Sequence, residues 1–275
     1  MITRTIRGVE VPAFFYGTAW KEERTEALTS QALAAGFRAV DTANQRKHYV
    51  ESAVGAAVEK SGIDRAELFL QTKFTHADGQ DHRIPYERGL KPRFQVEQSF
   101  QSSLEHLGTD YVDAYLLHGP SLPDRFSDED WEVWRKMGEL ERDGKTRLIG
   151  VSNVSLAHLE ALFGSDEAKP ALVQNRCYAR TGWDREVRAF CRAHEIGYQG
   201  FSLLTANRKE LARPEVKKIA ERYGRTIPQV VFRFALEVGM IPLTGTSSEA
   251  HLKEDLASFD FSLAPGEIAL LERLG

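Results

Sequence analysis

Residues 36–58 read GFRAVDTANQRKHYVESAVGAAV: a short apolar run ends at Asp41, a polar loop follows, and a segment with helical spacing closes the stretch. A strand that leads directly into a helix is typical of sheets with parallel strands, because such strands need a crossover connection. The number of times this unit recurs therefore decides the fold.

The strand–helix unit recurs along the whole chain. With residues 16–20 (YGTAW) as the first strand, eight apolar runs are bounded by turn signals and followed by segments with helical spacing. The other seven strands are predicted at residues 37–43, 68–74, 111–118, 147–153, 171–177, 196–202 and 240–245.

Eight such units close more naturally into a barrel than into an open sheet, and 275 residues is close to the usual size of that barrel. A doubly wound sheet that binds a dinucleotide would be expected to carry a GxGxxG loop after an early strand, and the sequence contains none. We therefore predict one α/β domain over residues 1–275, a single (β/α)8 TIM barrel. An N-terminal β-hairpin within residues 5–15 is expected, with two additional helices, one before the last strand and one at the C-terminus.

One predicted helix shows its buried face and its end plainly. Val96, Phe100, Leu104 and Leu107 recur at steps of three and four residues, and Gly108 follows as a stop. Two further helices are predicted to begin at the serines in positions 127 and 155.

Composition narrows the class of partner. A formal net charge of −4 and a pI of about 6.1 argue against nucleic acid, whose binders usually carry a basic stripe. The only cysteines, Cys177 and Cys191, form no CxxC pair or zinc-like cluster, so we expect no metal and a reducing compartment. A signal-peptide core and a membrane span are not visible, so we expect a cytoplasmic protein. A barrel of this size buries enough surface to stand alone, so we expect a monomer.

Polar residues occur where three consecutive strands should end. Asp41, Lys73 and His118 close the second, third and fourth predicted strands. Because the carboxyl ends of barrel strands meet at one mouth, the acid, the amine and the imidazole should converge on a site that can position a proton. Taken singly, each has a structural explanation, as a turn cap, a side chain that reaches solvent, or a half-buried histidine. The polar stretch 75–93 is expected to form a loop at the same mouth.

Several segments read in order like the motifs of one family. Residues 36–58 resemble the signature of the aldo-keto reductase superfamily, in which Asp-Thr-Ala precedes a tyrosine and a Glu-x-x-Val-Gly helix start. Six further segments are similar to its later motifs: Thr-Lys at 72–73, LLHGP at 116–120, GVSN at 150–153, VQN at 173–175, FSLL at 201–204 and PLTGTSSEAHLKEDL at 242–256.

The resemblance implies carbonyl reduction with NAD(P)H. In that family a tyrosine hydroxyl donates a proton to the carbonyl oxygen while nicotinamide C4 delivers hydride, and Asp41, Lys73 and His118 would complete the catalytic tetrad. A free tyrosine, with a pKa of about 10, is a poor acid at neutral pH, so we expect the Lys73 cation to lower that pKa. Asp41 would keep Lys73 charged, and His118 would hold the carbonyl oxygen.

The tyrosine is where this sequence departs from the family pattern. Counting from Asp41 places Arg46 at the family's tyrosine position, and counting back from Glu51 places His48 there. Tyr49 is the only tyrosine in the segment, so we expect a lengthened loop to deliver it as the proton donor. The alternatives are that His48 serves as the acid, or that catalysis is lost.

The resemblance also implies a set of cofactor-binding residues. Ser152, Asn153 and Gln174 would hold the nicotinamide carboxamide, and Phe201 would stack on its ring. The expected cofactor-binding residues are Thr18, Ser152, Asn153, Gln174, Phe201, Ser202, Leu204, Gly245, Thr246, Ser247, Glu254 and Asp255.

Cofactor and substrate are predicted less sharply. Family habit favours NADP(H) over NAD(H), but Leu243 and His251 stand where basic residues often neutralise the 2′-phosphate, so NAD(H) or dual use stays open. Trp20, Phe74 and Tyr86 are expected to wall the substrate pocket, which suits an apolar aldehyde or ketone. The alternative function is a regulatory module that binds nicotinamide cofactor with little or no turnover.

Overall fold

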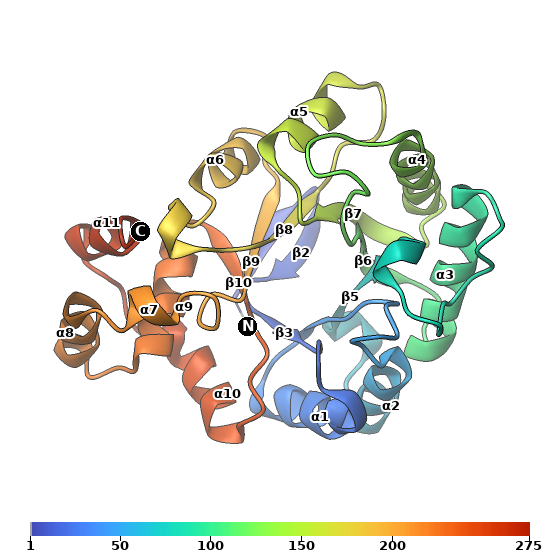
Figure 1. The fold of residues 1–275 in the computed structure, drawn as a ribbon. Helices are drawn as coiled ribbons and strands as arrows, with labels where there is room; N and C mark the ends of the chain where they lie inside the picture. Colours follow the sequence, from blue (N-terminus) through green and yellow to red (C-terminus); the bar gives the residue numbers. More distant parts are fainter. Residues whose placement is uncertain (1) are drawn as a thin grey trace.

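Eight parallel strands form a closed barrel at the centre of the molecule, surrounded by helices (Figure 1). The computed structural model describes residues 2–275. Around the barrel the strands pair in the order β10-β3-β4-β5-β6-β7-β8-β9, so they follow the chain and close between the last and the first. The strands are β3 (Phe15–Gly17), β4 (Ala39–Asp41), β5 (Phe69–Phe74), β6 (Val112–Leu117), β7 (Thr146–Ser152), β8 (Leu172–Arg176), β9 (Gly197–Phe201) and β10 (Met240–Thr244).

The helices alternate with the strands and lie outside the barrel (Figure 1). They are α1 (Thr25–Ala35), α2 (Glu51–Ser61), α3 (Pro92–Leu107), α4 (Asp128–Arg142), α5 (Leu156–Gly164), α6 (Arg185–Ala193), α7 (Arg208–Leu211), α8 (Pro214–Tyr223), α9 (Ile227–Glu237), α10 (Glu249–Leu256) and α11 (Pro265–Glu272). The predicted barrel is confirmed. Between β9 and β10 the short helix α7 precedes the two expected helices.

The N-terminal hairpin closes one end of the barrel. It pairs β1 (Thr3–Ile6) with β2 (Val9–Pro12), slightly earlier than expected. The side chains of Ile6, Val9 and Val11 are buried in the same cluster as the barrel interior. This plug covers the end opposite the carboxyl ends of the strands and leaves only the latter open for a site.

The observed helix ends confirm the stop at Gly108 and the start at Ser127 that the sequence predicted. Gly108 ends α3 in the left-handed region, with φ of 65°, where a side chain would be strained. Ser127 caps α4 through a reciprocal pair of hydrogen bonds with Asp130. Among residues 2–275, none of the helices combines the length and the hydropathy that a membrane crossing requires.

Candidate active site

A cavity of about 640 Å³ opens at the carboxyl ends of the barrel strands. Its wall includes Tyr49 and His118 near the barrel axis, and Glu254 and Asp255 on α10. Side chains alternate between the two faces of a strand, so residues at matching positions on neighbouring strands point into the same mouth.

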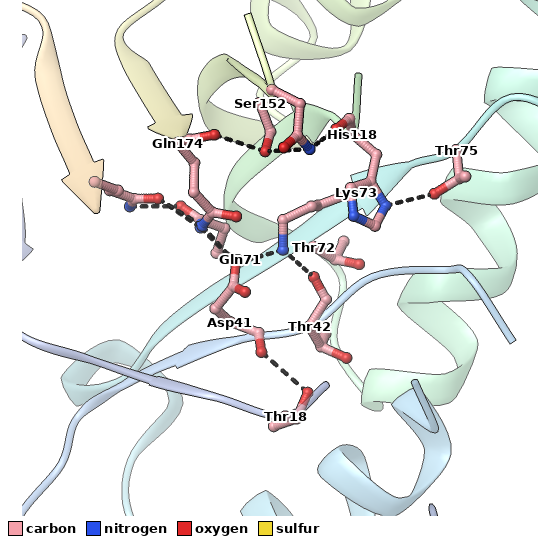
Figure 2. A network of polar contacts seen from close by, with 12 residues as sticks. Thr18, Asp41, Thr42, Gln71, Thr72, Lys73, Thr75, His118, Ser152 and Gln174 are labelled. Carbon is pink, nitrogen blue, oxygen red and sulfur yellow. Dashed lines mark hydrogen bonds and ion pairs between the residues drawn. The ribbon is translucent and has the colours of Figure 1, made fainter. Parts of the chain in front are cut away.

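Asp41 and Lys73 form a buried ion pair beneath the cavity (Figure 2). Lys73 Nζ lies 2.6 Å from Asp41 Oδ1 and donates to the backbone oxygen of Thr42 at 2.8 Å. The Lys73 side chain is 1% exposed. Burial lowers the pKa of Lys73, while the charge of Asp41 and the hydrogen bond to it act in the opposite direction. The ion pair is thus a buried, rigid support for the site and not a solvent-exposed contact.

Tyr49 lies against both Lys73 and His118. The ammonium of Lys73 is 5.5 Å from the centroid of the Tyr49 ring, and the Tyr49 and His118 rings are 5.9 Å apart in an edge-on arrangement. The tyrosine therefore reaches two of the other expected tetrad residues, Lys73 and His118, despite its shifted position in the sequence. The lengthened loop turns at Gln45, whose backbone oxygen accepts from the backbone N–H of Tyr49 at 3.1 Å.

The electrostatics of Tyr49 differ from the expectation. Burial, followed by the charge of Asp41, raises the pKa of Tyr49 above its ordinary value, and Arg176 acts in the opposite direction. The expected lowering of the Tyr49 pKa does not occur in this structure, because burial and the charge of Asp41 both act in the opposite direction. Tyr49 is consequently a neutral phenol at physiological pH.

His48, the alternative acid, occupies a different place. Its ring stacks on Trp20, with centroids 3.5 Å apart, and its backbone oxygen accepts from the Trp20 N–H at 2.8 Å. Trp20 is 66% exposed, so the pair lies at the rim of the cavity. The geometry favours Tyr49 over His48 as the group adjacent to Lys73.

Ten of the expected cofactor-binding residues line the cavity: Ser152, Asn153, Gln174, Phe201, Ser202, Leu204, Gly245, Thr246, Glu254 and Asp255. The other two, Thr18 and Ser247, do not. Thr18 is fully buried, and its hydroxyl donates to the backbone oxygen of Asp41 at 3.0 Å, so it supports β4 instead of facing the cavity.

The amide of Gln174 is already engaged inside the barrel. It donates to Asp41 Oδ1 at 3.1 Å and to Gln199 Oε1 at 2.9 Å. Gln71 donates to the same oxygen of Asp41 at 2.6 Å and exchanges two hydrogen bonds with Gln199. Two buried amides, those of Gln71 and Gln174, therefore hold the carboxylate that faces Lys73, and Gln199 links the two. Gln71 and Gln199 were not predicted as site residues, although polar residues inside apolar strands were a visible signal.

Phe74 and Tyr86, expected to wall the substrate pocket, belong to the hydrophobic core. Neither lines the cavity, and they are 0% and 6% exposed. Phe74 follows Lys73 on β5, so the alternation of side chains directs it away from the mouth. Its ring stacks on that of Tyr86, with centroids 5.5 Å apart. Of the three expected wall residues, only Trp20 lines the cavity.

Arg176 lines the cavity but was not predicted as a site residue. It ends β8, lines the cavity, and holds its guanidinium 5.4 Å from the centroid of the Phe201 ring. A charged residue at a strand end was the same signal that identified Lys73. In residues 2–275, no other lysine or arginine lines this cavity.

Comparison with known proteins gives a consistent result. The sequence model of the aldo/keto reductase family matches residues 14–275. A glyoxal reductase of Bacillus subtilis is 33% identical over 269 residues, which cover 97% of this chain and 90% of that protein. A methylglyoxal reductase of Escherichia coli is 30% identical, with 93% of this chain and 86% of that protein covered. A solved aldo/keto reductase structure from Brucella melitensis is 32% identical, with a TM-score of 0.86 over 100% of this chain and 99% of that one.

Proposed function

Because the chain belongs to the aldo/keto reductase family, whose members are oxidoreductases that use nicotinamide cofactors, we propose that it reduces aldehydes or ketones to alcohols with Tyr49 as proton donor. The observation that carries this proposal is that Lys73 and His118 both lie beside the ring of Tyr49, and that Tyr49 and His118 line the cavity. The names of its relatives, a glyoxal reductase and a methylglyoxal reductase, support small reactive carbonyls as substrates.

The cavity suits a nicotinamide dinucleotide. It is extended, with hydrogen-bonding side chains at Ser152 and Asn153 near the tetrad, and it continues to α10, where Ser248 begins a helix whose N-terminus favours anions. The bound cofactor would supply a hydride to the carbonyl carbon. Phe201 would offer an apolar face to its ring, and Glu254 would contact its adenosine end.

Because members of the family generally use NADPH, NADP(H) is the favoured cofactor of this chain. One observation favours NAD(H) as a second candidate. The cavity wall near α10 carries His251, Glu254 and Asp255, whereas the one arginine of the wall, Arg176, lies at the Phe201 end. A 2′-phosphate would therefore meet little positive charge from the wall. Calorimetric titration with NADPH and NADH distinguishes the two.

The residues of this chain perform the proton chemistry. A carbonyl oxygen placed between Tyr49 and His118 would accept the phenolic proton as negative charge develops on it. Lys73, held near the Tyr49 ring by Asp41, would stabilise the phenolate left behind. Burial raises the pKa of Tyr49, so the donor is protonated at neutral pH but is a weak acid, and stabilisation of the phenolate by Lys73 would offset this.

Tyr49→Phe tests whether Tyr49 is the proton donor. We expect it to lower kcat for methylglyoxal and nitrobenzaldehyde by a factor of about 10² to 10⁴, because it removes the transferable proton and keeps the ring. The absorbance of the reduced cofactor measures turnover, and calorimetry checks that the variant still binds the cofactor.

His48→Asn is the matched control for this prediction, since it changes the neighbouring residue outside the tetrad. If His48→Asn abolished turnover while Tyr49→Phe remained active, the proton donor would be His48. Tight cofactor binding by the unaltered protein, without turnover of any carbonyl in a broad panel, would instead identify the regulatory module.

A further inference from the structure

Three hydrogen bonds fix His118 at the end of β6. Its backbone N–H donates to the backbone oxygen of Phe74 at 2.8 Å, and its backbone oxygen accepts from Asn153 Nδ2 at 2.8 Å. Its ring nitrogen Nδ1 lies 2.8 Å from the hydroxyl of Thr75 (Figure 2). The ring itself lines the cavity. The first two bonds place the residue, and only the third acts on the imidazole.

The direction of that third bond follows from the partners of Thr75. Within residues 2–275, the Thr75 hydroxyl has no hydrogen-bond partner other than His118 Nδ1. A buried hydroxyl that accepted a proton from Nδ1 would leave its own hydrogen without an acceptor, at a cost of about 1–3 kcal/mol. The hydroxyl therefore donates to an unprotonated Nδ1. In a neutral imidazole the proton then lies on Nε2.

We propose that Thr75 is a positioning residue that fixes His118 in the tautomer with the proton on Nε2, so that the imidazole presents an N–H donor to a carbonyl oxygen in the cavity. Nε2 has no partner among residues 2–275 and faces away from Thr75 (Figure 2). The part of this inference that concerns a carbonyl oxygen rests on the proposed function. The tautomer itself does not.

The imidazole is neutral throughout the working range of pH. Burial, followed by the nearby charge of Lys73, lowers the pKa of His118 to about 3. A charged imidazole would carry protons on both nitrogens and would need no help to donate. Because His118 is neutral, only one nitrogen can donate, and the Thr75 hydroxyl determines which one.

The long loop after β5 holds Thr75 in position. The backbone oxygen of Thr75 accepts from the Tyr86 hydroxyl at 2.7 Å and from Gln80 Nε2 at 3.4 Å. A Cβ at Gly79 would lie 2.7 Å from the Thr75 methyl group, so the loop closes tightly on that methyl. Threonine is stiff at χ1, and these contacts leave its hydroxyl aimed at His118. The loop thus acts on the site through Thr75, without lining the cavity.

The test compares Thr75→Val, which keeps the branched shape and removes the hydroxyl, with Thr75→Ser, which keeps the hydroxyl. We expect Thr75→Val to lower kcat about tenfold, the equivalent of one lost hydrogen bond, with the KM for the carbonyl and the Kd for the cofactor little changed. Thr75→Ser should restore most of kcat. Thr29→Val is the matched control, because Thr29 on α1 is fully buried and its hydroxyl has no partner among residues 2–275.

A second readout does not depend on turnover. Two-dimensional ¹H–¹⁵N spectra of the imidazole rings, with His118 assigned by the loss of its signals in His118→Asn, report which nitrogen is protonated. We expect the unaltered protein to show a protonated Nε2 and an unprotonated Nδ1, and Thr75→Val to show a mixture of tautomers.

Two results would overturn the inference: a protonated Nδ1 in the unaltered protein, or a Thr75→Val variant that keeps both the tautomer and kcat. A protein that reduces no carbonyl would refute the proposed function, while the spectra would still decide the role of Thr75.

Discussion

Asp255 holds its carboxyl group in the cavity wall beside α9 and β10. It is 3% exposed and accepts from the Thr244 hydroxyl at 2.7 Å. Burial, outweighing that hydrogen bond and the nearby His251, raises the pKa of Asp255 to about 7, and the charge of Glu254 adds to the rise. An Asp in the unfolded chain ionises near pH 4. Between these two values the folded protein holds a proton that the unfolded chain has lost.

Asp255 should therefore make the protein less stable as pH rises. The contribution of its proton to the free energy of unfolding is fully present below about pH 4 and is lost as the pH passes 7. The reason is that the unfolded chain binds fewer protons than the folded protein across that range. We expect Asp255→Asn, which cannot ionise, to gain in Tm relative to the unaltered protein between pH 5 and pH 8. Calorimetric unfolding without cofactor measures this difference. A Tm difference that is the same at both pH values would contradict the assignment.

At the scale of residues, the sequence predicted which residues form the site better than it predicted where their side chains point. Asp41, Lys73 and His118 were predictable because polar residues close three consecutive strands at matching positions, which separate structural roles do not readily explain. Thr75 was not, because its role depends on which ring nitrogen of His118 it meets. The shift in the Tyr49 pKa was predicted with the wrong sign, since the sequence could not show how deeply the phenol is buried or that the charge of Asp41 acts on it.

Helices α2 and α3 approach closely at Gly55. A Cβ at this position would lie 2.1 Å from the backbone oxygen of His106 on α3. Alanine is the better helix former by about 1 kcal/mol, but separating two packed helices costs about 1–3 kcal/mol or more, so the clash should win. We expect Gly55→Ala to lower the free energy of unfolding, as measured by denaturant titration.

Gly266 provides the matched control for that substitution. It lies in the first turn of α11, and a Cβ there would meet nothing within 4 Å. Gly266→Ala should leave stability unchanged or raise it by up to about 1 kcal/mol. Equal effects of the two substitutions would show that the approach of α2 to α3 imposes no restriction on residue 55.

At the scale of elements, caps and buried faces were readable because they depend on neighbours in sequence. The ends of α3 and α4 follow from Gly108 and Ser127. The path of the loop after β5 was not readable in this way. Its polar composition suggested a wall of the cavity, whereas Tyr86 turns inward onto Phe74. Contacts between residues distant in sequence decide such a path.

The barrel is paired unevenly around its circumference. β3 has only two paired positions with β4 and two with β10, whereas β6 and β7 share five. Fewer ladder hydrogen bonds mean a lower free energy of local opening. The weak seam lies beside Trp20 and Gly245, where the cofactor is proposed to bind.

Hydrogen exchange should reveal this seam. We expect the amides of β3 and β10 to exchange faster than those of β6 and β7, and saturation with the nicotinamide cofactor to slow β3 and β10 selectively, because a ligand across the seam must be released before it opens. Mass spectrometry of peptic fragments measures both rates. Uniform protection around the barrel would contradict this account.

At the scale of the molecule, closure of the strands into a barrel was predictable from the sequence, whereas the strand register and the hairpin plug were not. Eight strand–helix units without a dinucleotide loop left a barrel as the architecture that accounts for every strand. The register that leaves β3 short, and the burial of Ile6 and Val11 as a plug, depend on how the ring closes. Such geometry has no local sequence signal.

The tryptophans of this protein differ sharply in their surroundings. Trp134 and Trp183 are fully buried, whereas the Trp20 indole is 66% exposed and rests on the His48 ring at the rim. Buried indoles emit at shorter wavelengths than hydrated ones, so the long-wavelength side of the emission spectrum reports mainly on Trp20. Iodide should quench it first. The native chain thus carries an optical probe at the entrance to its own cavity, and changes in its emission can time the arrival and departure of ligands without any label.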